Sequence, residues 1–249
     1  MSDPTSSTGQ CLNCNATLTG NYCQECGQSA KIKRLTFREA IDDFFSSTFA
    51  LEGPLLFTLK SLILNPGRMF REFISGRRKT YYKPIAFFIV LTAIYLIVKA
   101  LIDYDPLEGE FRQADENAHP RVIKFKEAAR YMVTHINNIM LIFVFSIGIN
   151  LKLFFSKRYN LTEYLIISFY IIGVYILFAT GVMIVDKFLF STSKVFIFSF
   201  LALYIIYSSA TLFQSKSFLA YFKYLLVAVL SIALYMTAGF ALSYLIVTL

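Results

Sequence analysis

Five long apolar stretches constrain this chain of 249 residues more than any other feature. They are approximately Ile85–Ile102, Thr134–Phe154, Leu161–Val185, Val195–Phe213 and Phe218–Val247. Each approaches the roughly 20 residues that an α-helix needs to cross a bilayer. The chain is 56% hydrophobic, above the roughly 45–50% of ordinary soluble domains. The sequence therefore predicts an all-α integral membrane protein with about five transmembrane helices.

The loops between these stretches differ in charge. The loop Asp103–Arg121 carries six acidic and two basic side chains, whereas the loop 156–160 and the turn 214–217 carry only basic ones. Cytoplasmic loops of membrane proteins are enriched in Lys and Arg. We therefore expect the N-terminus of the protein in the cytoplasm and Leu249 on the outer side of the membrane. Lys124, Lys126 and Arg130 oppose this pattern and are assigned to an amphipathic helix that leads into the second span.

All four cysteines lie within sixteen residues near the N-terminus. Cys11 and Cys14 form one C-x-x-C pair, and Cys23 and Cys26 form a second pair after eight intervening residues. Two such pairs provide the four thiolates of a tetrahedral zinc site. The first thirty residues are polar and lack the apolar stretch of a signal peptide, so we expect reduced thiols in the cytoplasm. The sequence predicts a closed structural Zn²⁺ site; a redox dithiol or disulfide and a rubredoxin-like iron site are the alternatives.

The predicted organisation has four parts. Residues 1–10 form a flexible leader, 11–30 a zinc ribbon, 31–84 an amphipathic cytoplasmic collar and 85–249 the five-span membrane domain. The ribbon is too small to bury a core, so metal binding has to drive its folding. We find no internal repeat in the sequence.

The collar is expected to lie on, or dip into, the cytoplasmic leaflet as amphipathic interfacial helices. Thr36 and Glu39 form a capping box that opens the first of them. Residues 55–64 are apolar but too short to span, and residues 69–74 form another short amphipathic segment. Tyr81, Tyr82 and other tyrosines near the span ends fit the membrane interface, where the ring is buried and the hydroxyl is hydrated.

The order of these features resembles domain-of-unknown-function family 3667, a family of bacterial zinc-ribbon multi-pass membrane proteins. The resemblance rests on motifs in residues 11–100, which are Cys23-Gln-Glu-Cys26-Gly27-Gln28, Pro66-Gly67, Gly76-Arg77-Arg78 and Tyr81-Tyr82-Lys83-Pro84. Asn15 departs from the pattern, because glycine is common at that position. The resemblance implies a location in the bacterial inner membrane, with Leu249 in the periplasm, and a multi-pass architecture. It implies no activity, because the family has no established one. The collar and five spans are also similar to the five-span Yip family, whose members organise membranes and recruit partners.

Two further groups of polar residues are candidate sites. Arg77, Arg78, Lys79 and Lys83 flank the first span and predict either binding of anionic lipid headgroups or a determinant of topology alone. His135, Asn137 and Asn138 are the candidates for an intramembrane polar patch; packing between helices is the simpler interpretation of the same residues.

These features favour a non-enzymatic inner-membrane protein whose ribbon and basic collar recruit or hold a partner at the cytoplasmic face. We expect the bilayer, its anionic lipids and a protein partner or a homo-oligomer as partners, and no nucleic acid. The alternative is a small transporter, channel or lipid-handling protein with a polar path through the helix bundle. A membrane-embedded enzyme that acts on lipid is a third hypothesis, although the sequence contains no Gly-rich phosphate loop and no nucleophile elbow.

Overall fold

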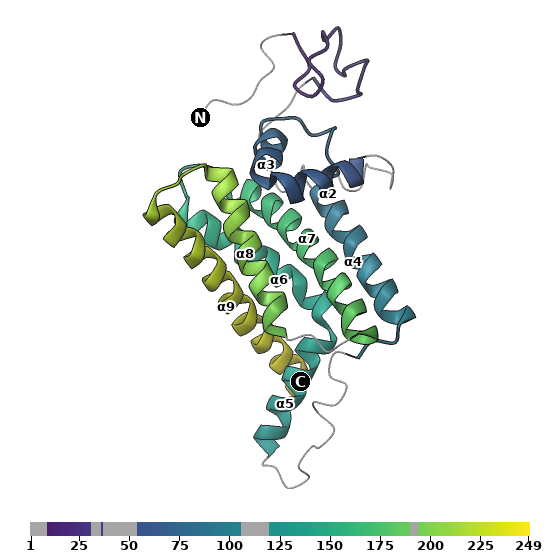
Figure 1. Ribbon diagram of the computed structural model, residues 1–249, viewed down its shortest axis with the longest axis vertical. Helices are drawn as coiled ribbons and strands as arrows, with labels where there is room; N and C mark the ends of the chain where they lie inside the picture. Colours follow the sequence, from purple (N-terminus) through teal and green to yellow (C-terminus); the bar gives the residue numbers. More distant parts are fainter. Residues whose placement is uncertain (1–8, 31–35, 37–53, 106–119, 190–193) are drawn as a thin grey trace.

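The computed structural model confirms the all-α prediction (Figure 1). It describes residues 9–30, 36, 54–105, 120–189 and 194–249, and every regular element named within them is an α-helix. The helices are α2 (Pro54–Leu64), α3 (Pro66–Ile74), α4 (Pro84–Leu101), α5 (Pro120–Thr134), α6 (Ile136–Phe154), α7 (Leu161–Phe188), α8 (Lys194–Phe213) and α9 (Phe218–Thr248). The capping box predicted at Thr36 and Glu39, and the helix it would open, extend over residues outside the described part.

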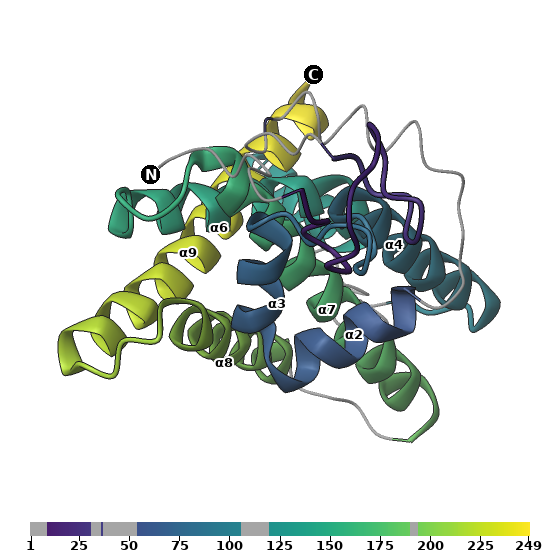
Figure 2. The same ribbon diagram turned by 90° about the horizontal axis from the view of Figure 1, so that it is seen from above.

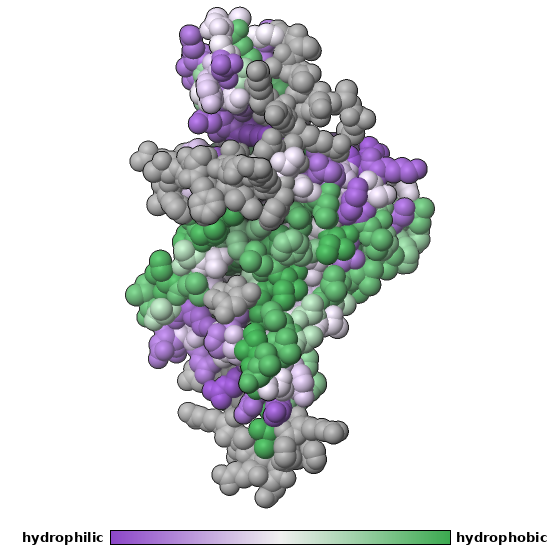
Figure 3. Space-filling view, turned by 180° about the vertical axis from the view of Figure 1, so that it is seen from behind, coloured by the Kyte–Doolittle hydropathy of each residue, from purple (hydrophilic) through white to green (hydrophobic). Residues whose placement is uncertain are grey.

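The helices form a multi-pass membrane bundle. Within the described residues, α4, α7, α8 and α9 are long and apolar enough to cross a membrane, and α5 with α6 gives a fifth crossing if that bent pair counts as one span. Figure 3 shows a broad hydrophobic band across one face of the molecule, with hydrophilic residues above and below it. Four to five spans therefore match the prediction from the apolar stretches.

The helix boundaries follow local signals in the sequence. Proline occupies the first turn of α3 and of α4, where its missing N–H costs nothing. Asn160 and Glu163 form a reciprocal capping box at the start of α7. Ser217 caps α9 by accepting from the backbone of Ala220. These signals explain why the predicted spans and the observed helices agree closely at most of their ends.

Helix α7 is the centre of the bundle. It packs against α4, α6 and α8, and 78% of its most apolar window is buried, against 33% or less for α4, α8 and α9. The residues around its whole circumference are apolar, as expected for a helix enclosed by others. A Cβ on Gly173 would lie 2.4 Å from the Phe87 ring, so the absence of a side chain lets α4 approach α7 closely.

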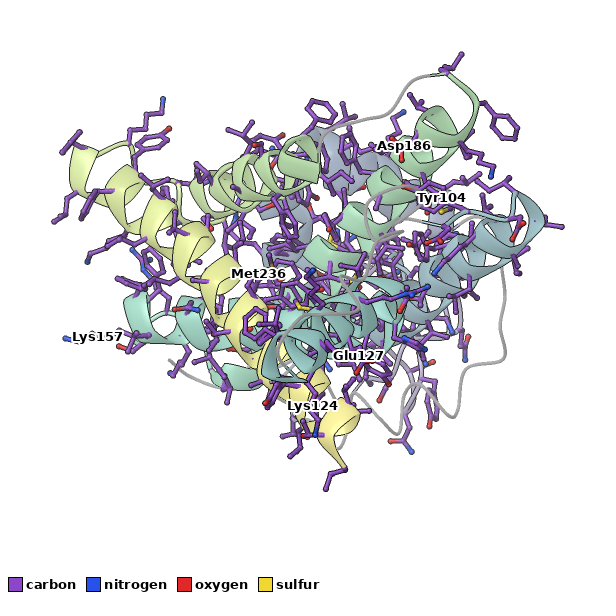
Figure 4. All side chains as sticks on the ribbon, turned by 90° about the horizontal axis from the view of Figure 1, so that it is seen from below. Tyr104, Lys124, Glu127, Lys157, Asp186 and Met236 are labelled. Carbon is purple, nitrogen blue, oxygen red and sulfur yellow. The ribbon has the colours of Figure 1, made fainter. Side chains whose placement is uncertain are left out.

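The second span begins with a bend. Helix α5 turns into α6 through an angle of 82° at His135. The predicted lead-in helix with Lys124 and Glu127 is α5, which lies along α9; Figure 4 labels both side chains on it. Lys99 at the end of α4 donates a hydrogen bond of 3.1 Å to the Thr134 carbonyl. A cation near the last carbonyls of a helix stabilises that end, so α4 holds α5 where it stops.

The collar helices α2 and α3 lie across one end of the bundle, over α7 and α8 (Figure 2). Gly67 lies against the last turn of α8, where its N–H donates to Thr211 Oγ1 over 3.1 Å. A Cβ on Gly67 would lie only 2.0 Å from the Thr211 carbonyl carbon. Arg71 donates to the carbonyls of Thr211 and Leu212, at 2.5 and 2.9 Å, and so caps the C-terminal end of α8, where the last carbonyls have no partner within the helix. The collar is thus docked through backbone contacts that only glycine permits.

An aromatic cluster joins the collar to the central helix. The rings of Phe70 and Phe73 in α3 and of Phe87 in α4 surround Tyr170 of α7, with centroids 5.6–6.2 Å apart. The Tyr170 hydroxyl donates to the Tyr82 carbonyl over 2.6 Å, which satisfies a buried polar group on each side. The loop before the first span is therefore held from inside the protein.

This contact corrects one expectation from the sequence. Tyr81 and Tyr82 were placed in an aromatic belt with hydrated hydroxyls, yet both residues are buried in the protein, at 5% and 8% exposure. The Tyr81 hydroxyl donates to Glu72 over 2.6 Å, and the Tyr82 N–H donates to Thr58 Oγ1 over 2.8 Å. These partners could not be predicted from the local sequence, because Thr58 lies in α2 and Glu72 lies in α3.

The docking of Gly67 yields a stability prediction. The Gly67→Ala variant must push α3 away from the backbone of α8, and overpacking of this kind costs about 1–3 kcal/mol. Gly181→Ala is the matched control, because a Cβ there meets nothing within 4 Å. We expect Gly67→Ala alone to lower the thermal midpoint in detergent, measured by circular dichroism. Equal midpoints for the two variants would contradict the docking geometry.

Candidate metal centre and the loop beneath it

The four cysteine sulfurs converge on one point. The Sγ atoms of Cys11, Cys14, Cys23 and Cys26 all lie within 4.8 Å of one another. The Cys11–Cys26 and Cys14–Cys23 pairs are each separated by 3.5 Å, and all four cysteines are free. Tetrahedral Zn–S bonds of about 2.3 Å place sulfurs roughly 3.8 Å apart. The cluster is therefore shaped for a closed four-thiolate metal site, as the sequence predicted.

The ribbon consists of two equivalent hairpins offset by twelve residues. The Cys11 N–H donates to the Ala16 carbonyl, and the Cys23 N–H donates to the Gln28 carbonyl, both over 2.8 Å. Isolated bridges flank the two turns in the same register, at Gln10–Thr17 and Tyr22–Ser29. The expectation of no internal repeat was wrong, because the repeat lies in backbone geometry and in cysteine positions. The shared C-x-x-C spacing at a period of twelve was the signal available in the sequence.

Each hairpin needs one residue in the left-handed region. Asn15 has a φ of 63° and Gly27 a φ of 69°, and each N–H donates to the carbonyl of the first cysteine of its pair over 2.8 Å. Glycine adopts this conformation without cost, and asparagine is the next most tolerant type. The departure of Asn15 from the glycine of the resembled family therefore leaves the turn intact.

The protonation of the thiols shows why a cation fits. Burial raises the pKa of the Cys11 thiol, but hydrogen bonds from the backbones of Cys14 and Asn13 and from neighbouring thiols lower it to about 7. The backbone of Ala16 lowers the pKa of Cys14, but desolvation and the neighbouring thiols raise it to about 12. Four thiols this close cannot all ionise without a positive charge among them. A Zn²⁺ ion held by these cysteines would supply that charge and a structural link.

Two side chains of the ribbon hold the basic loop, which comprises residues 76–80 between α3 and α4. Gln28 Oε1 accepts from the N–H groups of Arg78 and Lys79, each over 3.2 Å. Asn13 Oδ1 accepts from the Thr80 N–H over 3.0 Å and from the Thr80 hydroxyl over 2.6 Å. Both acceptors lie within two residues of a cysteine in the sequence. Sequence reasoning missed their role, although Gln28 belongs to the C-x-x-C-G-Q motif.

The basic loop is also held from below by Glu72 in α3. The carboxylate accepts from Arg68 over 2.7 Å, from Arg77 over 3.2 Å and from Tyr81 over 2.6 Å. Partial burial raises the pKa of Glu72. The hydrogen bonds from Tyr81 and Arg68 and the charge of Arg77 lower it by more, so the pKa is below its usual range. The stabilisation from Glu72 is therefore complete above the ordinary carboxyl pKa and is lost as pH falls through the lowered value.

The predicted lipid-binding residues gather between the ribbon and the bundle. Arg77 contacts Glu72, and Lys79 Nζ lies 3.9 Å from where a Cβ on Gly27 would stand. Lys83 is the residue before the first turn of α4. These positions place the basic group at the ribbon end of the bundle, and its binding of lipid headgroups stays a prediction.

The predicted intramembrane patch falls at the opposite end. His135 is exposed and lies one residue before α6, outside the helix itself. Its ring stacks on Tyr131 with centroids 4.2 Å apart, and Nδ1 lies 2.9 Å from Thr134 Oγ1. The side chains of Asn137 and Asn138 lie outside the described part of the chain. The patch therefore stays a prediction for those two residues.

A contact between the segment that follows α4 and the end of α7 at this far end was not predicted. The Tyr104 hydroxyl donates to Asp186 Oδ2 over 2.6 Å, as Figure 4 shows from below. Lys187 Nζ donates to the Asp103 carbonyl over 3.1 Å. The first span and the central helix are thus joined beyond their apolar parts.

The metal site yields a direct prediction. Purified protein should hold about one zinc ion per chain by elemental analysis, because a tetrahedral site uses all four thiolates. Cys14→Ser and Cys26→Ser should each lose most of that zinc, since three thiolates leave the ion open to water and chelators. Asn15→Gly is the control, because glycine fits its φ of 63° and should retain the metal. Full zinc content in both serine variants would contradict the assignment.

Comparison with known proteins gives one match. Residues 52–96 are similar to a family described as Protein of unknown function (DUF3667). The matched segment covers α2, α3, the basic loop and most of α4, and it does not include the ribbon. No curated protein and no solved structure matches the chain. The part of the chain that is similar to this family therefore runs from the second half of the collar into α4, and the likeness to the Yip family receives no support.

Proposed function

We propose that this is a non-enzymatic protein of the bacterial inner membrane whose zinc ribbon holds a partner protein at the cytoplasmic face. The observation that carries the proposal is the attachment of the ribbon. Asn13 and Gln28 fasten one side of it to the basic loop, while Tyr22 stays 67% exposed to solvent. Exposed tyrosines are frequent anchors of protein interfaces. A rigid, oriented ribbon with a free aromatic side chain suits recognition.

The charge distribution supports a cytoplasmic ribbon. The ribbon end of the bundle carries the basic loop, Lys157, Arg158 and Lys216, whereas the far end is mixed and carries Asp103 and Asp186 beside Lys99 and Lys187. This asymmetry follows the positive-inside tendency. The exposed basic residues of α5 reduce the asymmetry without reversing it. The C-terminus then lies in the periplasm.

The closed metal site supports a structural role. A catalytic zinc keeps one coordination position for water or substrate, whereas four thiolates fill all positions of a tetrahedral ion. The metal would therefore fold the ribbon and take no part in a reaction. The basic loop next to it is suited to attract anionic lipids, at about 1 kcal/mol per basic side chain near the surface.

Polar groups inside the bundle argue against the alternative of a polar transport path. The Ser146 and Ser168 hydroxyls each donate to a carbonyl one turn earlier in their own helix, and Asn150 donates to the Ser146 carbonyl. Among the described residues, the one buried acidic or basic side chain is Glu163, which caps α7. Such local pairing favours a packed bundle.

The orientation leads to a prediction from reporter fusions. Alkaline phosphatase fused after Leu249 should be active, because that enzyme matures only in the periplasm, and a fluorescent protein fused before the ribbon should fluoresce. In the loop 156–160, a fused fluorescent protein should fluoresce and a fused alkaline phosphatase should be inactive, because this loop is expected in the cytoplasm. An active phosphatase in that loop would reverse the proposed topology.

The recruitment proposal is tested by crosslinking in intact membranes. A photo-crosslinking amino acid in place of Tyr22 should capture a protein, whereas the same group at Val229, which is 51% exposed on α9, should not capture it. The product should disappear when Cys14→Ser and Cys26→Ser are added, because the ribbon then cannot fold. A product of twice the chain mass would identify the partner as a second copy. An unchanged product in the cysteine variants would refute recruitment by the folded ribbon.

A further inference from the structure

We propose that metal binding by the ribbon sets the conformation of the basic loop, so that residues 78–80 are held only when the four cysteines are loaded. The inference goes beyond the proposed function, because it concerns the collar of the chain itself and needs no partner. It rests on two side-chain carbonyls, one in each half of the ribbon, that accept hydrogen bonds from consecutive loop amides.

The loop amides depend on these acceptors to different degrees. The Arg78 N–H is shared between Gln28 Oε1 and the Gly76 carbonyl, which lies 2.9 Å away. The Lys79 N–H donates to Gln28 Oε1, and the Thr80 N–H donates to Asn13 Oδ1. Lys79 and Thr80 therefore report most directly on whether the ribbon is in place.

The position of each acceptor is fixed by the metal ligands. Asn13 lies between Cys11 and Cys14, inside the first C-x-x-C turn. Gln28 is two residues after Cys26, and its backbone carbonyl accepts from the Cys23 N–H. Among the described residues of the ribbon, the buried hydrophobic side chains are those of Cys11 and Cys23 alone. With so small a core, the turns persist only while a metal joins them, and both acceptors leave the loop when it is removed.

The rest of the collar does not depend on the ribbon. Glu72 holds Arg77 and Tyr81 on the two sides of the held amides, and Thr58 accepts from the buried Tyr82 N–H. Gly67 is docked on α8 independently. Metal removal should therefore loosen a stretch of about three residues between two anchored points, and leave α2, α3 and α4 in place.

Hydrogen exchange on the full chain in detergent, measured by mass spectrometry at single-residue resolution, tests whether the ribbon holds the loop amides only when zinc is bound. In the zinc-loaded protein the amides of Lys79 and Thr80 should be protected, and a chelator should speed their exchange roughly tenfold, as expected for loss of one hydrogen bond. The Tyr82 amide should exchange equally slowly in both states, because its acceptor lies in α2.

Variants distinguish the loss of the hydrogen bonds to Asn13 and Gln28 from a general unfolding of the ribbon. Asn13→Ala with Gln28→Ala should keep one zinc ion by elemental analysis, yet exchange at Lys79 and Thr80 as fast as the chelated wild type. Gln24→Ala is the control, because Gln24 is exposed in the same hairpin as Gln28. Equal exchange with and without chelator, or unchanged protection in the zinc-loaded double variant, would overturn the proposal. Either result leaves the crosslinking test of recruitment unaffected.

Discussion

The close approach of Gly67 to the last turn of α8 positions everything at the ribbon end of this protein. Without a side chain at that residue, α3 reaches the backbone of Thr211, and Arg71 can cap the end of α8. The orientation of α3 then places Glu72 under the basic loop, where it holds Arg77 and Tyr81. The loop in turn presents its amides to the ribbon. A module of some twenty residues is thus connected to a membrane bundle by a series of short polar contacts.

The spans and the thiol cluster could be predicted because their signals are local. An apolar segment as long as α7 can form little other than a transmembrane helix. Two C-x-x-C pairs can converge on one metal ion whichever side chains lie between them. The same applies to the caps at Asn160 and Ser217. In each case the residues that decide the outcome lie within a few positions of one another.

What could not be predicted depends on residues that are far apart in sequence. Asn13 meets Thr80 across 67 positions, and Tyr170 meets Tyr82 across 88. A tyrosine before a span is equally suited to a membrane interface and to a protein interior, and only the presence of Tyr170 and Thr58 decides between them. The bend at His135 was hidden for a similar reason, because the cation that caps α5 is Lys99 from another helix.

The extent of the family match agrees with this division of roles. Residues 52–96 contain Thr58, Gly67, Glu72, Tyr81 and Phe87, each of which makes a contact that requires its particular side chain or the absence of one. Apart from residues that contact the collar, such as Tyr170 and Thr211, the later helices mostly bury apolar surface, for which volume and hydrophobicity tolerate exchange. A lipid-facing residue such as Val229 needs only to be apolar. The collar is therefore the part of the chain in which sequence and geometry are most tightly connected, because it has to join the four-cysteine ribbon to a membrane bundle.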